Sequence, residues 1–156
     1  MFFKTSPQVF YKWRVFLLRL FGARIGVDVI IRPSVHIQFP WKLEIGDYAW
    51  IGDEVVIYNL GKIKIGANAV ISQRSYLCAG SHDYTKIDFP ISNEPILIEN
   101  EVWLATDVFV GPGVTIGQGA VVGARSSVFK NLEGGNVYAG SPVKYIKPRV
   151  MNESSN

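Results

Sequence analysis

The chain has 156 residues, of which 48% are hydrophobic and 19% are charged, and its formal net charge is +3. This length suits one domain with a real core, and the small positive charge is too weak to argue for a nucleic-acid partner. It does suit an anionic small ligand such as a nucleotide cofactor. A single cysteine, Cys78, excludes an internal disulfide framework and is compatible with a reducing cytosol. We therefore expect a cytoplasmic protein.

The first predicted element is a helix over residues 7–21. Ser6 and Pro7 form a favourable N-cap and N1 pair, and Gly22 supplies a stop. The segment is too short and too charged to span a bilayer, and no signal peptide is visible. We interpret residues 1–24 as a helical cap over the open end of the next domain. The alternative, which does not exclude the cap, is a basic amphipathic helix that makes a peripheral contact with the inner face of the membrane.

The central part of the chain carries an aliphatic residue at every sixth position. From Ile98 to Val128 the pattern is unbroken, and a small or β-branched residue follows each of the first five aliphatic positions by four. An α-helix needs apolar spacings of three and four, and a plain strand needs two. A period of six fits short flat strands joined by tight corners, with three hexads in each triangular coil. The pattern predicts an all-β fold, a left-handed parallel β-helix, over residues 25–133.

The same rhythm begins at Ile25 and divides the chain into about five coils. Two extra residues at 41–42 and at 61–62 are expected at bulged corners. Because coils stack at the interstrand spacing of about 4.8 Å, five coils give a prism about 24 Å long. The predicted inward columns are positions 25, 45, 65, 98 and 116, then 31, 51, 71, 104 and 122, and finally 37, 57, 77, 110 and 128.

One insertion interrupts the repeat in the third coil, between Leu77 and Ile98. It begins with the run GSHDY, contains two prolines and shows no periodicity. Solenoids accept such excursions at their corners, where they commonly line the binding face. We therefore predict an extended loop from about residue 82 to 95. After the last coil, residues 134–156 are expected to form a tail, in which the run VYAGSPVKYIKPR is basic and contains no acidic residue.

These motifs resemble a known family. The hexads are similar to those of the hexapeptide-repeat acyltransferases. The run SHDY, the segment VWLATDVFVGPGVTIGQGAVVGARSSV and the ending AGSPVKYIKPR are similar to the maltose, galactoside and nodulation O-acetyltransferases. The opening RLFGARIG and the central ISQRSYLCAGSHDY resemble the colanic-acid-type exopolysaccharide O-acetyltransferases most closely. The resemblance covers roughly residues 13–149, and it implies an enzyme that transfers an acetyl group from acetyl-CoA to a sugar hydroxyl in exopolysaccharide, capsule or other surface-glycan biosynthesis, without a metal.

Acetyl transfer to an alcohol needs a base for the hydroxyl proton. The chain contains two histidines, His36 and His82. His36 lies at an outward position of its hexad, and we interpret it as a surface residue. His82 begins the loop, and the resemblance implies that it is the general base. The alternative for His82 is a loop histidine that caps a turn, and Asp83 is expected either to orient the imidazole or to bind acceptor hydroxyls.

The resemblance also implies a cofactor groove between two neighbouring prisms. There Ala105 and Ala124 are expected to offer backbone contacts to the pantetheine arm of coenzyme A, and Thr106 a hydroxyl. The residues expected to bind the phosphates are Lys130, Lys147 and Arg149. The polar residues expected to hold the hydroxyls of a saccharide, whether free or carried on a nucleotide or a lipid, are Glu54 and Asn59 on the second coil. Tyr58 and Tyr84 are candidates for stacking on a sugar ring.

A single prism offers only half of this groove. The family is trimeric, so the resemblance implies a homotrimer with its active sites between adjacent subunits. Large aromatic residues at outward positions support an interface independently, namely Trp50, Trp103 and Phe109. Two alternative functions stay open: N-acetylation of an amino sugar and a non-catalytic β-helical scaffold. A γ-type carbonic anhydrase needs three histidines on zinc, and the two histidines of this chain do not meet that requirement.

Overall fold

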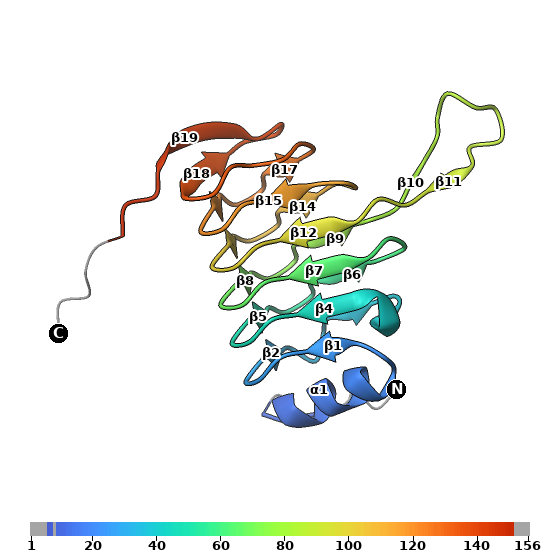
Figure 1. Cartoon of the computed structure of the whole chain (residues 1–156), viewed down its shortest axis with the longest axis vertical. Coiled ribbons are helices and arrows are strands. Elements are labelled where there is room, and N and C mark those ends of the chain that lie inside the picture. The colour runs from blue at the N-terminus through green and yellow to red at the C-terminus, as the bar shows by residue number, and fades with distance from the viewer. Residues whose placement is uncertain (1–5, 8, 152–156) are drawn as a thin grey trace.

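Three stacked sheets form the walls of a triangular solenoid, which Figure 1 shows with helix α1 (Tyr11–Leu20) across one end. The first sheet contains β1 (Arg24–Ile25), β4 (Leu43–Ile45), β7 (Ile63–Ile65), β12 (Ile96–Ile98) and β15 (Thr115–Ile116). The second contains β2 (Ile30–Ile31), β5 (Trp50–Ile51), β8 (Val70–Ile71), β13 (Trp103–Leu104), β16 (Val121–Val122), β18 (Asn136–Ala139) and β19 (Lys144–Pro148). The third contains β3 (His36–Ile37), β6 (Val56–Tyr58), β9 (Tyr76–Cys78), β14 (Phe109–Val110) and β17 (Ser127–Val128).

The computed structural model describes residues 6–7 and 9–151. Residues 1–5, 8 and 152–156, which belong to the predicted cap and tail, lie outside the described residues.

The predicted inward columns are confirmed on all three sheets. In the first sheet the parallel register places Ile45 on Ile25, Ile65 on Ile45, Ile98 on Ile65 and Ile116 on Ile98. The other two columns pair in the predicted order as well. All of these side chains are buried except Ile37, which is half-buried against the core. Branched aliphatic side chains pack well on flat stacked strands, so the repeat produces one continuous apolar core.

The chain makes about six turns rather than about five. Beyond the fifth coil, Leu132 bridges Ile116, and β18 pairs with β16 so that Tyr138 continues the second column above Val122. Strand β19 then turns back antiparallel to β18. The sixth turn escaped prediction because a tyrosine stands where the next aliphatic residue of that column would be.

Turns connect the sheets in three columns along the solenoid. The first corner joins the first sheet to the second, the second corner joins the second sheet to the third, and the third corner leads back to the first sheet. The extra residues at 41–42 and 61–62 lie on the third corner, as predicted, and the first pair ends a 3₁₀ turn, η1 (Pro40–Lys42). On the second corner the left-handed backbone recurs at the residues Glu54, Arg74, Asp107 and Arg125. Non-glycine residues in this conformation are uncommon, and here the hydrogen bonds between stacked coils hold it in place.

Helix α1 satisfies the open edge of the first coil. Along the sheets, amides of one coil donate to carbonyls of the next coil, as Gly26 does to Ile45, whereas some corner amides donate in the opposite direction, as Tyr48 does to Val27. On the open side of the first coil, strand carbonyls such as those of Ile25 and Ile31 therefore have no strand amide as a donor among the described residues. Nε of the buried Arg14 donates a 2.7 Å hydrogen bond to the Ile31 carbonyl. The Arg19 guanidinium donates to the carbonyl of Ile25 at 2.7 Å and to that of Gly26 at 2.9 Å. These two arginines supply hydrogen-bond donors that the amides of a further strand would otherwise supply.

The helix is shorter than the predicted 7–21, because it begins at Tyr11. No side chain caps its N-terminus, and the predicted capping residue Ser6 instead accepts a 2.9 Å hydrogen bond from Nη1 of Arg14. The predicted stop is confirmed, since Gly22 follows the helix with a φ of +90°. Glycine adopts this left-handed backbone without the strain that a side chain adds.

The predicted excursion leaves the third coil as a β-hairpin, called the arm (residues 81–92). Strand β10 (Ser81–His82) pairs antiparallel with β11 (Ile91–Ser92), and Figure 1 shows the arm extended away from the coils. Its large apolar side chains are exposed, with Ile87 at 99% exposure. Apolar groups of this size are expected to be covered by another molecule.

Candidate active site

His82 lies exposed on the arm, and its imidazole is held by the backbone of the opposite limb. Nδ1 is 2.6 Å from the carbonyl oxygen of Phe89. A carbonyl oxygen only accepts hydrogen bonds, so Nδ1 carries the proton and Nε2 keeps its lone pair. Phe89 itself is fixed in a turn with a φ of +42°, and its amide donates to the Lys86 carbonyl at 3.1 Å. The arm therefore presents Nε2 as the basic atom, which is the tautomer that a general base needs.

Asp83, next in sequence, closes the base of the arm's turn. Its Oδ1 accepts hydrogen bonds from the Thr85 hydroxyl at 2.6 Å and from the Thr85 amide at 3.1 Å. The hydroxyl hydrogen bond, followed by that of the amide, lowers the pKa of this carboxyl. Lys86 Nζ lies 3.5 Å from Oδ2. The group that orients the imidazole is thus the Phe89 carbonyl, which has no side-chain signature in the sequence.

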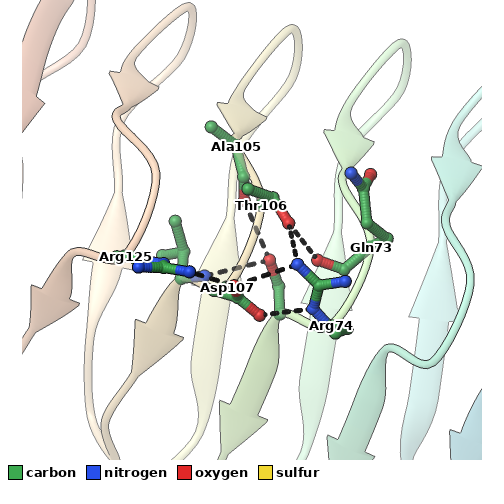
Figure 2. Close-up of polar contacts among 8 residues, drawn as sticks. Gln73, Arg74, Ala105, Thr106, Asp107 and Arg125 are labelled. Atoms are coloured by element: carbon green, nitrogen blue, oxygen red, sulfur yellow. Dashed lines mark hydrogen bonds and ion pairs between the residues drawn. The ribbon is translucent and has the colours of Figure 1, made fainter.

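Three of the predicted cofactor residues come together on the second corner. Ala105 and Thr106 lie on one coil and Ala124 on the next, where the Arg125 amide donates to the Thr106 carbonyl at 2.9 Å. Thr106 Oγ1 donates to the Gln73 carbonyl at 3.1 Å, as Figure 2 shows. Small side chains leave the backbone of this corner open to an extended ligand.

A network of charged side chains, which the sequence analysis missed, lies on the same corner (Figure 2). Arg74 donates from Nε and Nη2 to the two carboxylate oxygens of Asp107, at 2.8 Å and 3.1 Å, and Arg125 Nε lies 3.7 Å from Oδ2. The Arg74 hydrogen bonds hold the pKa of the Asp107 carboxyl below its ordinary value. One carboxylate thus holds the Arg74 guanidinium by two hydrogen bonds and attracts that of Arg125 beside the small residues of the corner. The sequence does carry a sign of this network, because charged residues recur at the same corner position in successive coils.

A cavity of about 300 Å³ opens on the second corner at the second and third coils. The residues that line it include Trp50, Glu54, Ser72 and Arg74. Carboxylate and guanidinium groups hydrogen-bond hydroxyls, and an indole packs against an apolar ring face. Nε1 of Trp103, on the next coil, donates to Oγ of the lining residue Ser72 at 3.0 Å. This mixture of groups suits a sugar, and it includes one of the predicted acceptor residues.

Asn59, the other acceptor residue predicted on the second coil, is buried at 0% exposure. Its Oδ1 accepts from the Phe39 amide at 2.9 Å, and its Nδ2 donates to the Phe39 carbonyl at 2.6 Å. Both polar groups therefore bind the coil beneath and build the third corner. Tyr84 lies exposed on the arm, two residues beyond His82.

Arg149 connects the tail to the first corner. Its Nη1 donates to the carbonyls of Glu101 and Gly119 at 2.9 Å and 3.0 Å. Its amide also donates to the Gly135 carbonyl at 2.8 Å. This guanidinium holds strand β19 against the solenoid.

The other predicted phosphate-binding residues are exposed lysines at the same end of the solenoid. Lys147 lies opposite Val137 in the β18–β19 pair, and Lys130 follows β17 on the third corner. Lys144, which the prediction omitted, lies opposite Ala139. Because β18 runs parallel to β16, Ala139 lies at the end of the strand that meets the second corner. Lys144 is therefore the tail cation placed towards Ala124.

One chain holds these groups at two separate places. The arm leaves the third corner after β9, whereas Ala105 and Thr106 follow β13 on the second corner. Figure 1 shows the arm directed away from the coils rather than folded across them. Across residues 6–7 and 9–151, no group of three or more His, Cys, Asp or Glu residues is placed to hold a metal ion. In that same part of the chain, no helix has the length and apolar character needed to cross a membrane.

Two solved structures with this architecture are acetyltransferases. A hexapeptide-repeat acetyltransferase of Vibrio cholerae O1 biovar eltor, in complex with acetyl-coenzyme A, superposes with a TM-score of 0.87 at 26% identity, covering 96% of this chain and 82% of that chain. A galactoside acetyltransferase in complex with coenzyme A also gives a TM-score of 0.87 at 26% identity, covering 96% and 76%. The fold and the corner geometry thus define a left-handed parallel β-helix of the acetyltransferase class.

Sequence comparison narrows the class. The chain is 62% identical over 151 residues to WcaF of Escherichia coli (strain K12), whose name describes a colanic acid biosynthesis acetyltransferase. The match covers 97% of this chain and 83% of that relative. No protein-family model matches the chain. The chain belongs to the family of hexapeptide-repeat acetyltransferases that contains WcaF, as the sequence motifs predicted.

Proposed function

We propose that the protein is an acetyl-CoA-dependent O-acetyltransferase that modifies a sugar hydroxyl during exopolysaccharide or other surface-glycan synthesis. The observation that carries this proposal is the hydrogen bond from His82 Nδ1 to the Phe89 carbonyl, which leaves Nε2 basic in a chain of an acetyltransferase family. Solved relatives of the same fold contain acetyl-CoA or coenzyme A, and one of them is a galactoside acetyltransferase. The predicted cytoplasmic location is part of this proposal.

In the proposed reaction, Nε2 of His82 takes the proton of the acceptor hydroxyl while its oxygen attacks the thioester carbonyl. The Phe89 carbonyl stabilises the imidazolium that forms, through the Nδ1 proton. The tetrahedral oxyanion, stabilised by backbone amides or a water, then releases the thiolate of coenzyme A. The imidazolium returns its proton to this thiolate, so that an ester and a free thiol leave a regenerated base.

The second corner is the proposed cofactor groove. Backbone groups of Ala105 and Ala124, and the Thr106 hydroxyl, line the path of the pantetheine arm. The exposed ammonium groups of Lys130 and Lys147 attract the phosphates. Arg149 contributes by anchoring strand β19, which carries Lys147. We thus divide the chain into the cap (1–24), the β-helix (25–133) and the tail (134–156). In this division the tail completes the cofactor site.

The cavity beneath this groove is the proposed acceptor site. Glu54 offers its carboxylate to sugar hydroxyls beside the Trp50 indole. Asp83 and Tyr84 of the arm approach the sugar from the other side together with His82. Asn59 supports the site from below, because it builds the third corner from which the arm leaves.

A thiol-release assay with acetyl-CoA and a panel of glycans tests the proposed function. We expect coenzyme A release that depends on a saccharide, and an alkali-labile acetyl ester in the product. Coenzyme A should also raise the melting temperature, because it binds only the native chain. An alkali-stable amide in the product would show N-acetylation instead. A protein that neither releases thiol nor is stabilised by coenzyme A would be a scaffold.

The proposed assembly is a homotrimer in which the arm of one subunit lies over the second corner of the next. The exposed apolar side chains of the arm and the outward indoles of Trp50 and Trp103 support such an interface. Each site would then combine His82 from one copy with Ala105 and Thr106 from another.

Shared sites predict complementation between two inactive variants. His82→Ala removes the base, and Ala124→Trp blocks the cofactor groove on the second corner. Co-expressed with different tags and purified through both, the mixed trimer should regain activity, because some of its sites pair an intact arm with an intact corner. Each variant alone, carried through the same two-tag purification, is the control. A mixed assembly as inactive as its parents would place both groups in one subunit.

A further inference from the structure

Helix α1 presents an apolar face to the outside, at the base of the solenoid. Its inward residues Val15 and Leu18 are buried against the first coil, together with Arg14. Large apolar side chains recur on the helix at spacings of three and four, and all of these are exposed: Phe10, Trp13, Phe16 and Leu20. Phe16 is 54% exposed and Leu20 67%. Because the Arg14 hydrogen bonds fix the inward face, the helix cannot rotate to bury this stripe.

A groove beside the start of the helix extends the apolar face. It has a volume of about 450 Å³, and its lining includes the apolar residues Phe10, Trp13 and Ile30 together with the charged residues Lys12 and Asp28. The Trp13 and Phe16 rings stack with their centroids 5.7 Å apart, which keeps the stripe continuous. Aromatic rings with a lysine beside them are typical of helices that lie in a membrane interface.

The charge around the apolar face of helix α1 indicates which kind of partner covers it. Helix α1 contains no acidic residue, and its exposed cations are Lys12 and Arg19. Nearby, Arg24 pairs with Glu44 at 3.4 Å, and Asp28 lines the groove. A second copy docked through the same face would bring two positive surfaces together. A bilayer with anionic headgroups satisfies both the apolar stripe and the positive charge. Arg19 stays exposed, and its hydrogen bonds to backbone carbonyls leave its charge in place.

We propose that helix α1 docks the protein on the surface of an anionic lipid bilayer. With ten residues the helix is too short to cross a bilayer, so it lies in the interface with Phe16 and Leu20 inserted. Figure 1 shows the helix across one end of the solenoid, so the coils stand away from the membrane. At the coil spacing, the cavity at the second and third coils lies only about 5–10 Å above the first coil. A saccharide carried on a membrane lipid is within reach there, a consequence that rests on the proposed function.

Co-sedimentation of the full chain with vesicles tests the docking. We expect the protein to pellet with phosphatidylcholine vesicles that contain phosphatidylglycerol, and to pellet much less with phosphatidylcholine alone. The double variant Phe16→Glu, Leu20→Glu should bind at least about tenfold more weakly, because two large apolar groups leave the interface and negative charge replaces them. Both positions are exposed, so its melting temperature should stay close to that of the wild type.

Val150→Glu is the matched control, because it adds a negative charge at an exposed apolar residue of the tail, beyond β19 and outside helix α1. It should pellet like the wild type. The proposal would be overturned if the wild type pelleted equally with and without phosphatidylglycerol in the vesicles. It would also be overturned if the double variant pelleted as much as the wild type. Light scattering tests the alternative, in which a second copy of the protein covers the stripe. If the wild type has twice the mass of the double variant in solution, the stripe is an interface between copies. Thiol release with a soluble acceptor is measured separately, so a failure of docking is distinct from a failure of the proposed reaction.

Discussion

Replacing His82 with alanine should lower turnover by about 10²–10⁴-fold, the usual contribution of a positioned proton acceptor. The variant keeps the arm, because β10 pairs with β11 through backbone groups and the imidazole is exposed. Acetyl-CoA should therefore bind with nearly unchanged affinity. Thiol release on the true acceptor measures turnover, and isothermal calorimetry with coenzyme A measures the cofactor affinity.

His36→Ala is the control for this experiment, since His36 is also an exposed histidine but lies on the first coil. It should stay close to the wild-type rate. A His82→Ala variant that keeps most of its turnover would remove His82 from the mechanism and make Asp83 or a bound water the base to test.

Ile116→Asp should prevent folding. Ile116 is fully buried between Ile98 and Leu132 in the first column. An unpaired carboxylate there costs several kcal/mol, and a domain of this size has a total stability of only about 5–15 kcal/mol. The stack has little room to rearrange, because each coil is hydrogen-bonded to the coils above and below it. Circular dichroism should show no cooperative thermal transition.

Thr115→Asp is the matched control, one residue earlier on the same strand. Thr115 is half-buried and alternates to the outer side of β15, so a carboxylate at this position stays in contact with water. It should melt cooperatively near the wild-type temperature. A soluble Ile116→Asp protein with a cooperative transition would contradict the stacked column on which the whole architecture depends.

The solenoid could be predicted because every coil solves the same packing problem with the same kind of residue. Isoleucine at 25, 45, 65, 98 and 116 marks one wall, and its period of six matches neither a helix nor a plain strand. The elements that were missed lack such a period. Strands β10 and β11 have two residues each, too few for any alternation, and Tyr138 hides the sixth turn behind a change of residue type.

Local propensity failed at the start of the helix because a distant side chain competed for the cap. The Ser6 hydroxyl suits an N-cap, yet it accepts a hydrogen bond from Arg14, whose guanidinium is fixed in turn by the Ile31 carbonyl. Similar competition applies at the site. The Asn59 amide suits a sugar hydroxyl, but the backbone of Phe39 uses both of its polar groups.

The candidate base could be chosen from the sequence, but its partner could not. The resemblance to the acetyltransferase family indicated His82 as the base, whereas the Phe89 carbonyl that orients His82 belongs to the backbone and carries no signature. The Arg74–Asp107 pair spans 33 residues, and only the stacking of coils brings the two side chains together. Its recurrence at one corner position could have been found by aligning the corners rather than the inward columns.

Both ends of the solenoid are closed by groups that do not continue it. Arg14 and Arg19 occupy the carbonyls of the first coil, and β19 reverses direction against β18 at the other end. Stacked parallel coils have no intrinsic limit, because the upper edge of each coil is a template for another, in the same molecule or in its neighbour. These two closures therefore set the length of the molecule, and they keep separate molecules from joining end to end into fibres.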